Sequence, residues 1–225
     1  MKVFPMCPDC LQEYKDPLDR RFHAQPNACD VCGPHVELKD KTGAPVSCED
    51  EIAELLRQIQ GGKIAAVKGL GGFHLVCDAA NAVAVSELRR RKHRPFKPFA
   101  VMTLNDLSAS RFVRISEKAS KELHSPQAPI VLCPKTNDAD RLLPGIAPEL
   151  NRIGIMMPYT PIHWLLFFEA IGRPEDPDWY KKECDLVLVM TSANAGGEPL
   201  VIGNDEAVQK LDGIADLFLT HNRDI

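Results

Sequence analysis

Short apolar segments alternate with helix-forming segments along most of this chain, from residue 47 onward. Short, apolar segments are typical of strands buried inside a sheet, and the apolar spacing between them fits amphipathic helices. This alternation predicts an α/β sheet, with the strand directions left open. The expected strands are 63–68, 73–77, 99–103, 129–133, 153–157, 186–190 and 217–220, and the expected helices lie between Asp50 and Gly61, before Lys92, and at 105–111, 116–124, 160–170 and 204–213.

A four-cysteine pattern sets the first part of the chain apart from this alternation. Cys7-x2-Cys10 is followed, after eighteen residues, by Cys29-x2-Cys32. Each pair directs two thiolates toward one point, and two such pairs close a tetrahedral site with four sulfur ligands. The pattern predicts a structural Zn²⁺ site, with an iron site of rubredoxin type as the alternative.

Length and composition limit the class of protein. The expected layout is a four-cysteine zinc finger over 1–38, a linker over 39–47 and an α/β domain over 48–225. The net charge of −4 argues against general nucleic-acid binding, although it leaves room for a local basic patch. Since no apolar run reaches the ~20 residues of a membrane span and no signal peptide is evident, we expect a cytoplasmic protein without a membrane partner.

A glycine-rich turn and a cluster of cations lie between two of the expected strands. Lys68 precedes the turn at 69–72, and the segment before the strand at 99–103 carries Lys92, Arg94 and Lys97. Glycines allow a ligand to approach the backbone closely, and gathered cations suit a polyanion such as a nucleoside triphosphate. Most charge runs are solvated helix faces, but Pro95 and Pro98 stiffen this one directly before a strand. We therefore predict an anion site here.

Two polar side chains follow another apolar strand and complete the candidate site. Ser192 and Asn194 come just after the strand at 186–190, where they could donate to a phosphate or carbonyl oxygen. Alone, this segment would indicate a turn, and the glycine turn alone is also a weak signal. By contrast, we interpret His74 and His163, which lie among apolar residues, as satisfied histidines of the core.

Several motifs together resemble a known family. KGLGGFHLVCDA, K-x-R-P-x-K-P-x-AVM, SPQAPIV, RIGIMMPYTPIHWLL, VMTSANAGGEP and LTHNRDI occur in the order seen in YrdC-type domains. The chain is most similar to the YrdC-like segment of the HypF family of hydrogenase-maturation carbamoyltransferases, and CPDCLQEYKDPLDRRFHAQPNACDVCGP resembles the second of that family's two zinc fingers. Departures are Ala128, where the family usually has Arg, and Gly196, where it usually has Ser.

The resemblance implies a fold and an activity. The fold would be a twisted, open, mixed sheet, and the reaction would join ATP and carbamate, derived from carbamoyl phosphate, into carbamoyl-adenylate and pyrophosphate with Mg²⁺. In the whole enzyme the carbamoyl group would pass to the terminal cysteine of a HypE-type partner. Phosphate contacts would come from Lys92, Arg94 and Lys97, carbamoyl or α-phosphate contacts from Lys68, Ser192 and Asn194, and further nucleotide contacts from Asn222 and Arg223.

Three other interpretations are open from the sequence. The first is an enzyme of the threonylcarbamoyl-AMP synthase type, against which the adjacent zinc finger argues. The second is an RNA-binding module without catalysis, which the acidic net charge disfavours. The third is a scaffold that lacks chemistry of its own, in a segment that looks cut from something longer.

Overall fold

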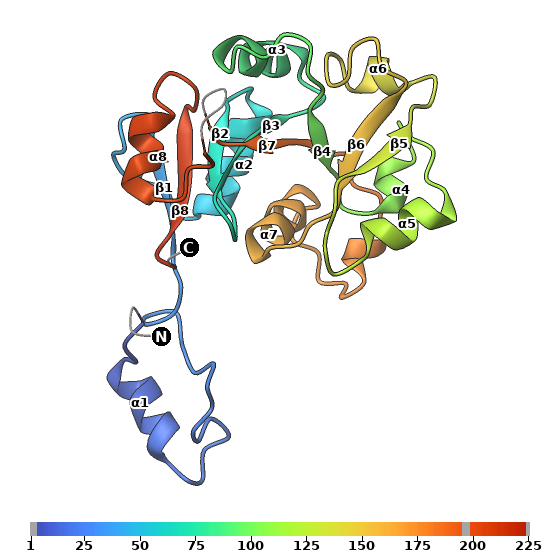
Figure 1. Cartoon of the computed structure of the whole chain (residues 1–225). Helices are drawn as coiled ribbons and strands as arrows, with labels where there is room; N and C mark the ends of the chain where they lie inside the picture. Colours follow the sequence, from blue (N-terminus) through green and yellow to red (C-terminus); the bar gives the residue numbers. More distant parts are fainter. Residues whose placement is uncertain (1–3, 195–198, 224–225) are drawn as a thin grey trace.

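The computed structural model describes residues 4–194 and 199–223, and its centre is one eight-stranded sheet (Figure 1). The strands lie in the order β1-β8-β2-β3-β7-β4-β6-β5. Their bounds are β1 (Val36–Asp40), β2 (Ala65–Lys68), β3 (Phe73–Asp78), β4 (Ala100–Met102), β5 (Val131–Pro134), β6 (Arg152–Met156), β7 (Leu188–Ser192) and β8 (Leu217–His221).

Strand directions are mixed. β2 pairs with β8 and β4 with β6 in parallel, and the other neighbours are antiparallel. The prediction of a mixed α/β sheet is therefore confirmed. Every expected strand is present, with bounds displaced by no more than two residues.

Helices cover both faces of the sheet, which separates two hydrophobic cores. α2 and α7 pack on one face, where Leu55 and Phe167 are fully buried, and α3, α4, α5, α6 and α8 pack on the other around Phe73 and Phe218. Alternate residues of the central strands point to opposite cores, as a pleated strand requires. The helices are α1 (Pro8–Lys15), α2 (Glu51–Gln60), α3 (Ala82–Arg91), α4 (Asp106–Ala109), α5 (Glu117–Leu123), α6 (Ala139–Leu142), α7 (Pro161–Ala170) and α8 (Asn204–Lys210), with a 3₁₀ turn η1 at Trp179–Lys181.

The cysteine-rich segment stands apart from the sheet, as Figure 1 shows, and the strand after it joins the sheet. β1 crosses the predicted boundary between residues 38 and 39 and pairs along β8, with Leu38 only 1% exposed. Just before β1, the backbone N–H of His35 donates to Asn222 Oδ1 at 2.9 Å, and the Asn222 N–H donates to the His35 carbonyl at 3.3 Å. The domain limits themselves remain predictions.

Candidate active site

Sheet topology places the predicted site residues at one edge, namely the side of the sheet on which β2, β7 and β8 end. β2 runs parallel to β8 and antiparallel to β3, and β3 runs antiparallel to β7, so β2, β7 and β8 all end on the same side. β4 begins on that side, because Ala100 pairs with Met190 near the end of β7. The cationic loop before β4 and the segment after β7 are therefore neighbours.

Direct hydrogen bonds join this loop to the end of β7. Lys92 Nζ donates to the Ser192 carbonyl at 2.7 Å, the Asn194 carbonyl at 3.0 Å and Asn194 Oδ1 at 3.3 Å. The Ser192 hydroxyl also donates to Asn194 Oδ1, at 2.8 Å. The structure thus brings Lys92 together with two predicted site residues, Ser192 and Asn194, that follow it by 100 and 102 positions in the chain.

Arg94 reaches the same strand end. Its guanidinium donates to Thr191 Oγ1 at 3.0 Å and lies 4.9 Å from the centre of the Phe99 ring. Lys97, the third predicted cation, is exposed. Thr191, only 7% exposed, is a contact that the sequence analysis missed.

The cations of α3 have structural partners instead. Arg89 donates to the carbonyl oxygens of Gly145, Ile146, Arg94, Pro95 and Lys97. It therefore holds the backbone of the cationic loop in place, a role that no sequence motif indicates. Arg90 pairs with Glu87, and Arg91 pairs with Glu87 and Asp216.

Burial changes the acidity of the central lysine. Desolvation, reinforced by the charges of Arg94 and Lys97, lowers the pKa of the Lys92 ammonium to about 8. The cause is that removal from water and nearby like charges both disfavour the protonated form. An anion bound here would favour that form again.

A cavity of about 560 Å³ lies beside these groups. Arg94, Thr191 and Ser192 line its polar side. Ile130, Leu132 and Leu150 line its apolar side and are 55%, 61% and 46% exposed. A cation-rich wall facing exposed aliphatic side chains suits a ligand with an anionic part and a flat, apolar part.

A larger cavity, of about 670 Å³, lies between α2 and α7. Glu49, Asp50, Glu54 and Glu169 line it, together with Arg57. These carboxylates would repel a polyphosphate, so the smaller cavity is the better candidate for an anion.

Other predicted residues lie along the same edge but line other cavities. Lys68 is 5% exposed, and its Nζ donates to the His221 carbonyl at 3.2 Å. It lines cavities of about 270 and 440 Å³ beside the end of β8. Arg223 lines the first and Asn222 the second, and the Asn222 side chain also holds His35. Their proposed ligand contacts remain predictions.

Two histidines differ from expectation. His163 is 1% exposed and His74 is half-buried, yet within the described chain His163 Nδ1, His163 Nε2 and His74 Nδ1 have no hydrogen-bond partner. The prediction that both are satisfied core histidines is therefore wrong. Nothing in a lone histidine among apolar residues signals whether its ring nitrogens will find partners.

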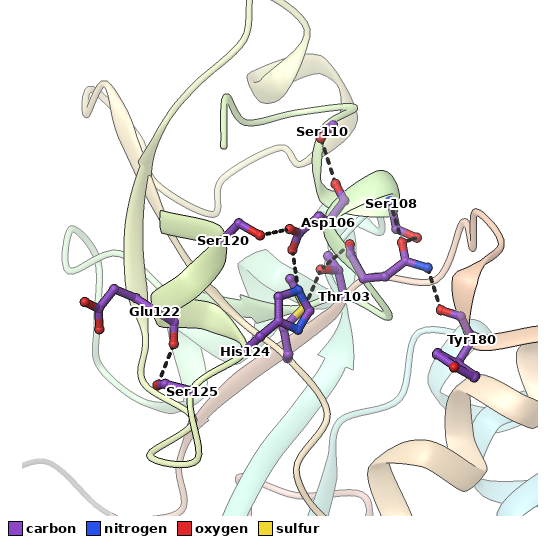
Figure 2. Close-up of polar contacts among 11 residues, drawn as sticks. Thr103, Asp106, Ser108, Ser110, Ser120, Glu122, His124, Ser125 and Tyr180 are labelled. Atoms are coloured by element: carbon purple, nitrogen blue, oxygen red, sulfur yellow. Dashed lines mark hydrogen bonds and ion pairs between the residues drawn. The ribbon is translucent and has the colours of Figure 1, made fainter. Parts of the chain in front are cut away.

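A second polar cluster, between α4 and α5, has a structural explanation (Figure 2). Asp106 accepts from the Ser120 hydroxyl and lies 3.0 Å from His124 Nε2. Since the carboxylate stands between the hydroxyl and the imidazole, the histidine cannot activate the serine as a nucleophile. Ser125, the first residue of the SPQAPIV motif, donates its hydroxyl to the Glu122 carbonyl near the end of α5.

The four predicted metal ligands do converge. The sulfur atoms of Cys7, Cys10, Cys29 and Cys32 all lie within 4.8 Å of one another. A tetrahedral site with Zn–S bonds of about 2.3 Å needs sulfur atoms about 3.8 Å apart, so the cluster suits a structural zinc. Backbone N–H groups lower the pKa of the Cys32 thiol to about 6, which favours the thiolate that binds metal.

Comparison with protein families assigns both parts of the chain. The Sua5/YciO/YrdC model, described as telomere recombination, matches residues 57–225, and the model described as the HypF finger matches residues 6–38. The chain belongs to the Sua5/YciO/YrdC family. Its finger and its relatives further identify it as a HypF-type segment.

The relatives are named carbamoyltransferases. The chain is 53% identical to carbamoyltransferase HypF2 of Cupriavidus necator and 48% identical to carbamoyltransferase HypF of Rhodobacter capsulatus, over 98% and 100% of its own length. It spans about a third of the length of these relatives, 34% and 28%.

Solved structures agree. A full-length HypF in a phosphate- and nucleotide-bound form superposes with a TM-score of 0.81 at 43% identity, covering 100% of this chain and 27% of that one. HypF of T. kodakarensis gives 0.82 at 42% identity, covering 100% and 28%. A Sua5 protein of P. abyssi, at 19% identity and a TM-score of 0.58 over 74% and 47%, shares the fold.

Two family departures can be located. Ala128 has a φ of 45°, and its backbone N–H donates to the Ser125 carbonyl at 3.0 Å, which closes a turn. Gly196 lies outside the described residues.

Within residues 4–194 and 199–223, no helix has the length and apolar character needed to cross a membrane.

Proposed function

We propose that this chain activates carbamate with ATP, forming carbamoyl-adenylate and releasing pyrophosphate. The observation that carries the proposal is the contact of Lys92 with both Ser192 and Asn194. It joins a cationic loop to a polar strand end beside a cavity with an apolar wall. Further support comes from the relatives named carbamoyltransferase and from a HypF solved with phosphate and a nucleotide.

The reaction needs charge stabilisation more than proton transfer. A carboxylate oxygen of carbamate attacks the α-phosphorus of ATP, the new P–O bond forms, and the bond to the β-phosphate oxygen breaks to release pyrophosphate. Carbamate is already an anion, so no general base is required. Negative charge on the phosphate oxygens and on the leaving group must be balanced by positive groups.

The chain offers groups for each part of the substrates. Lys92, Arg94 and Lys97 would bind the triphosphate, and Arg94 can do so from its place in the cavity wall. Ser192 and Asn194 would hold the α-phosphate and acyl oxygens. Lys68 would lie near the carbamoyl group or the α-phosphate, and Asn222 and Arg223 would contact the nucleotide.

Metal ions would have two separate roles. Mg²⁺ would enter with ATP and neutralise phosphate charge. Zn²⁺ would be held by Cys7, Cys10, Cys29 and Cys32, where four protein ligands leave no open position for catalysis. In the longer protein, the carbamoyl group would pass to the C-terminal cysteine of a HypE-type partner.

Isotope exchange between pyrophosphate and ATP tests the proposal. We expect exchange by this chain with Mg²⁺ and ammonium carbamate, and none when threonine with bicarbonate replaces carbamate. Lys92→Ala or Arg94→Ala should reduce exchange at least a hundredfold, because each removes a charged contact with the triphosphate. Arg90→Ala is the matched control, since Arg90 pairs with Glu87.

Three results would contradict the proposal. They are exchange that needs threonine, exchange that survives both substitutions, and no carbamate-dependent exchange by the unmodified chain.

A further inference from the structure

His74 stands next to Ser192 at the candidate active site. The two residues are directly paired across β3 and β7, so their side chains point to the same face of the sheet. Met190 and Ser192, which share that face of β7, both line the cavity of about 560 Å³. His74 therefore lies one strand away from the cavity, beside a residue of its wall.

Behind His74 lies a second histidine. The ring centres of His74 and His163 are 6.3 Å apart, and Tyr159 packs against His163 at 4.7 Å. His163 is placed at the first turn of α7, where Thr160 caps the helix by accepting from the His163 N–H at 3.3 Å. The two rings form a row that leads from the interior under α7 toward Ser192.

Neither imidazole is satisfied by the described chain. Both nitrogens of His163 and Nδ1 of His74 are buried without a hydrogen-bond partner there. Buried polar groups nearly always have partners, so three such atoms in one row point to a polar ligand as their partner. Around them are Tyr159, which meets His163 edge to face, and the glycine turn, where a Cβ added to Gly69 would lie 3.3 Å from His74 Nδ1.

Both rings are electrically neutral near pH 7. Desolvation lowers the pKa of His74, and desolvation together with His74 lowers the pKa of His163 to about 3. A neutral imidazole offers one N–H donor and one lone-pair acceptor without adding positive charge.

The proposed substrates need such a group. Carbamate carries an amino group, whose N–H bonds require acceptors, and its lone pair is spread into the carboxylate. The other polar groups at this edge are mainly donors: Lys92, Arg94 and the Ser192 hydroxyl. Asn194 Oδ1 is an acceptor, but it already receives bonds from Ser192 and Lys92.

We propose that His74 contacts the amino group of carbamate and of the carbamoyl-adenylate, and that His163 positions the His74 ring. This inference rests on the proposed function and deepens it by assigning recognition of the carbamoyl end. The cations would bind the phosphates, while the neutral imidazole would accept a hydrogen bond from the amino group at the carbamoyl end.

The test compares substitutions at His74 in carbamate-dependent pyrophosphate exchange. His74→Leu removes both ring nitrogens, His74→Asn places an amide near the position of Nδ1, and His74→Gln places one near Nε2. We expect His74→Leu to raise the KM for ammonium carbamate about tenfold, the loss of one hydrogen bond, while the Kd of a non-hydrolysable ATP analogue stays within twofold. One of the two amide variants should return the KM to within threefold of the unmodified value.

His163→Leu separates positioning from structure. Replacing an unsatisfied buried imidazole with an apolar side chain should leave the melting temperature unchanged or raise it. If His163 positions His74, the KM for carbamate should rise even though the fold is at least as stable. His124→Leu is the control, because that exposed imidazole lies in the separate cluster with Asp106.

The outcomes distinguish this inference from the proposed function. No exchange by the unmodified chain overturns both. Normal exchange with an unchanged carbamate KM in His74→Leu overturns this inference and leaves the proposed function standing. A loss of ATP-analogue affinity equal to the loss for carbamate, or failure of both amides to recover the KM, also overturns it.

Discussion

The cysteine-rich segment and the sheet are stabilised in different ways. Between residues 4 and 34, the buried residues are Cys10, Asn27 and Gly33, whereas the sheet buries two extensive apolar clusters. A segment that buries so little apolar surface depends on metal coordination, and a sheet with two cores does not. The two regions should therefore fail under different perturbations.

Loss of a metal ligand should have the largest effect, confined to the finger. We expect Cys10→Ser to abolish stoichiometric zinc and unfold residues 4–34, since structural zinc supplies about 10–16 kcal/mol in finger peptides. The melting temperature of the sheet should change by less than about 3 °C. Zinc analysis, limited proteolysis and thermal unfolding measure these effects.

Cys48→Ser is the control for that substitution, because Cys48 lies outside the four-sulfur cluster. A sheet that melts together with the zinc-free finger would show that the two regions are one cooperative unit.

A core truncation should produce the reverse pattern. Phe218 is fully buried in β8, and Phe218→Ala should reduce the free energy of unfolding of the sheet by about 3–5 kcal/mol. Zinc content should remain at one ion per chain. Exposed Phe96 provides the control, since Phe96→Ala removes the same side chain at 80% exposure. Release of zinc by Phe218→Ala under native conditions would show that the finger depends on the sheet.

The two regions should lose their ligands at opposite ends of the pH range. Lys92 is protonated below its pKa of about 8, so affinity for an ATP analogue should fall about tenfold between pH 7 and pH 9 as that charge is lost. Zinc should instead be lost in acid, because protons compete for the thiolates. Calorimetric titration and zinc analysis across pH measure both.

Lys92→Arg is the matched control for the alkaline arm. A guanidinium stays charged through pH 9, so nucleotide affinity in this variant should be flat over the same range. An equal decline in Lys92→Arg would assign the pH dependence to another group.

Much of the sheet could be predicted because local patterns agree with the fold. The apolar runs at 64–67 and 186–190 are buried on both faces, so composition alone identified them. β1 was missed because VELKD is short, charged and half-buried, and the strand that it pairs with, β8, lies about 180 residues away. Such pairing is decided by tertiary contacts and not by local preference.

Residue types in the sequence indicate the chemistry that a site could support, but they do not indicate the contacts that the folded geometry decides. Lysine and arginine beside glycine and proline indicated an anion site, and the structure brings Lys92 and Arg94 to the end of β7. The same charge run did not reveal that the Arg89 guanidinium would donate hydrogen bonds to backbone carbonyl oxygens. Whether the ring nitrogens of His74 and His163 have hydrogen-bond partners also depends on neighbours distant in sequence.

The pairing of β1 with β8 decides where the molecule can be cut. A version of the protein that starts at residue 39 would discard Leu38 from the interior and strip the outer edge of β8, leaving open backbone groups that invite association between copies. A version that starts at His35 would keep that edge covered and retain the backbone bonds to Asn222. A study of the sheet domain without the cysteine-rich segment should therefore begin at His35.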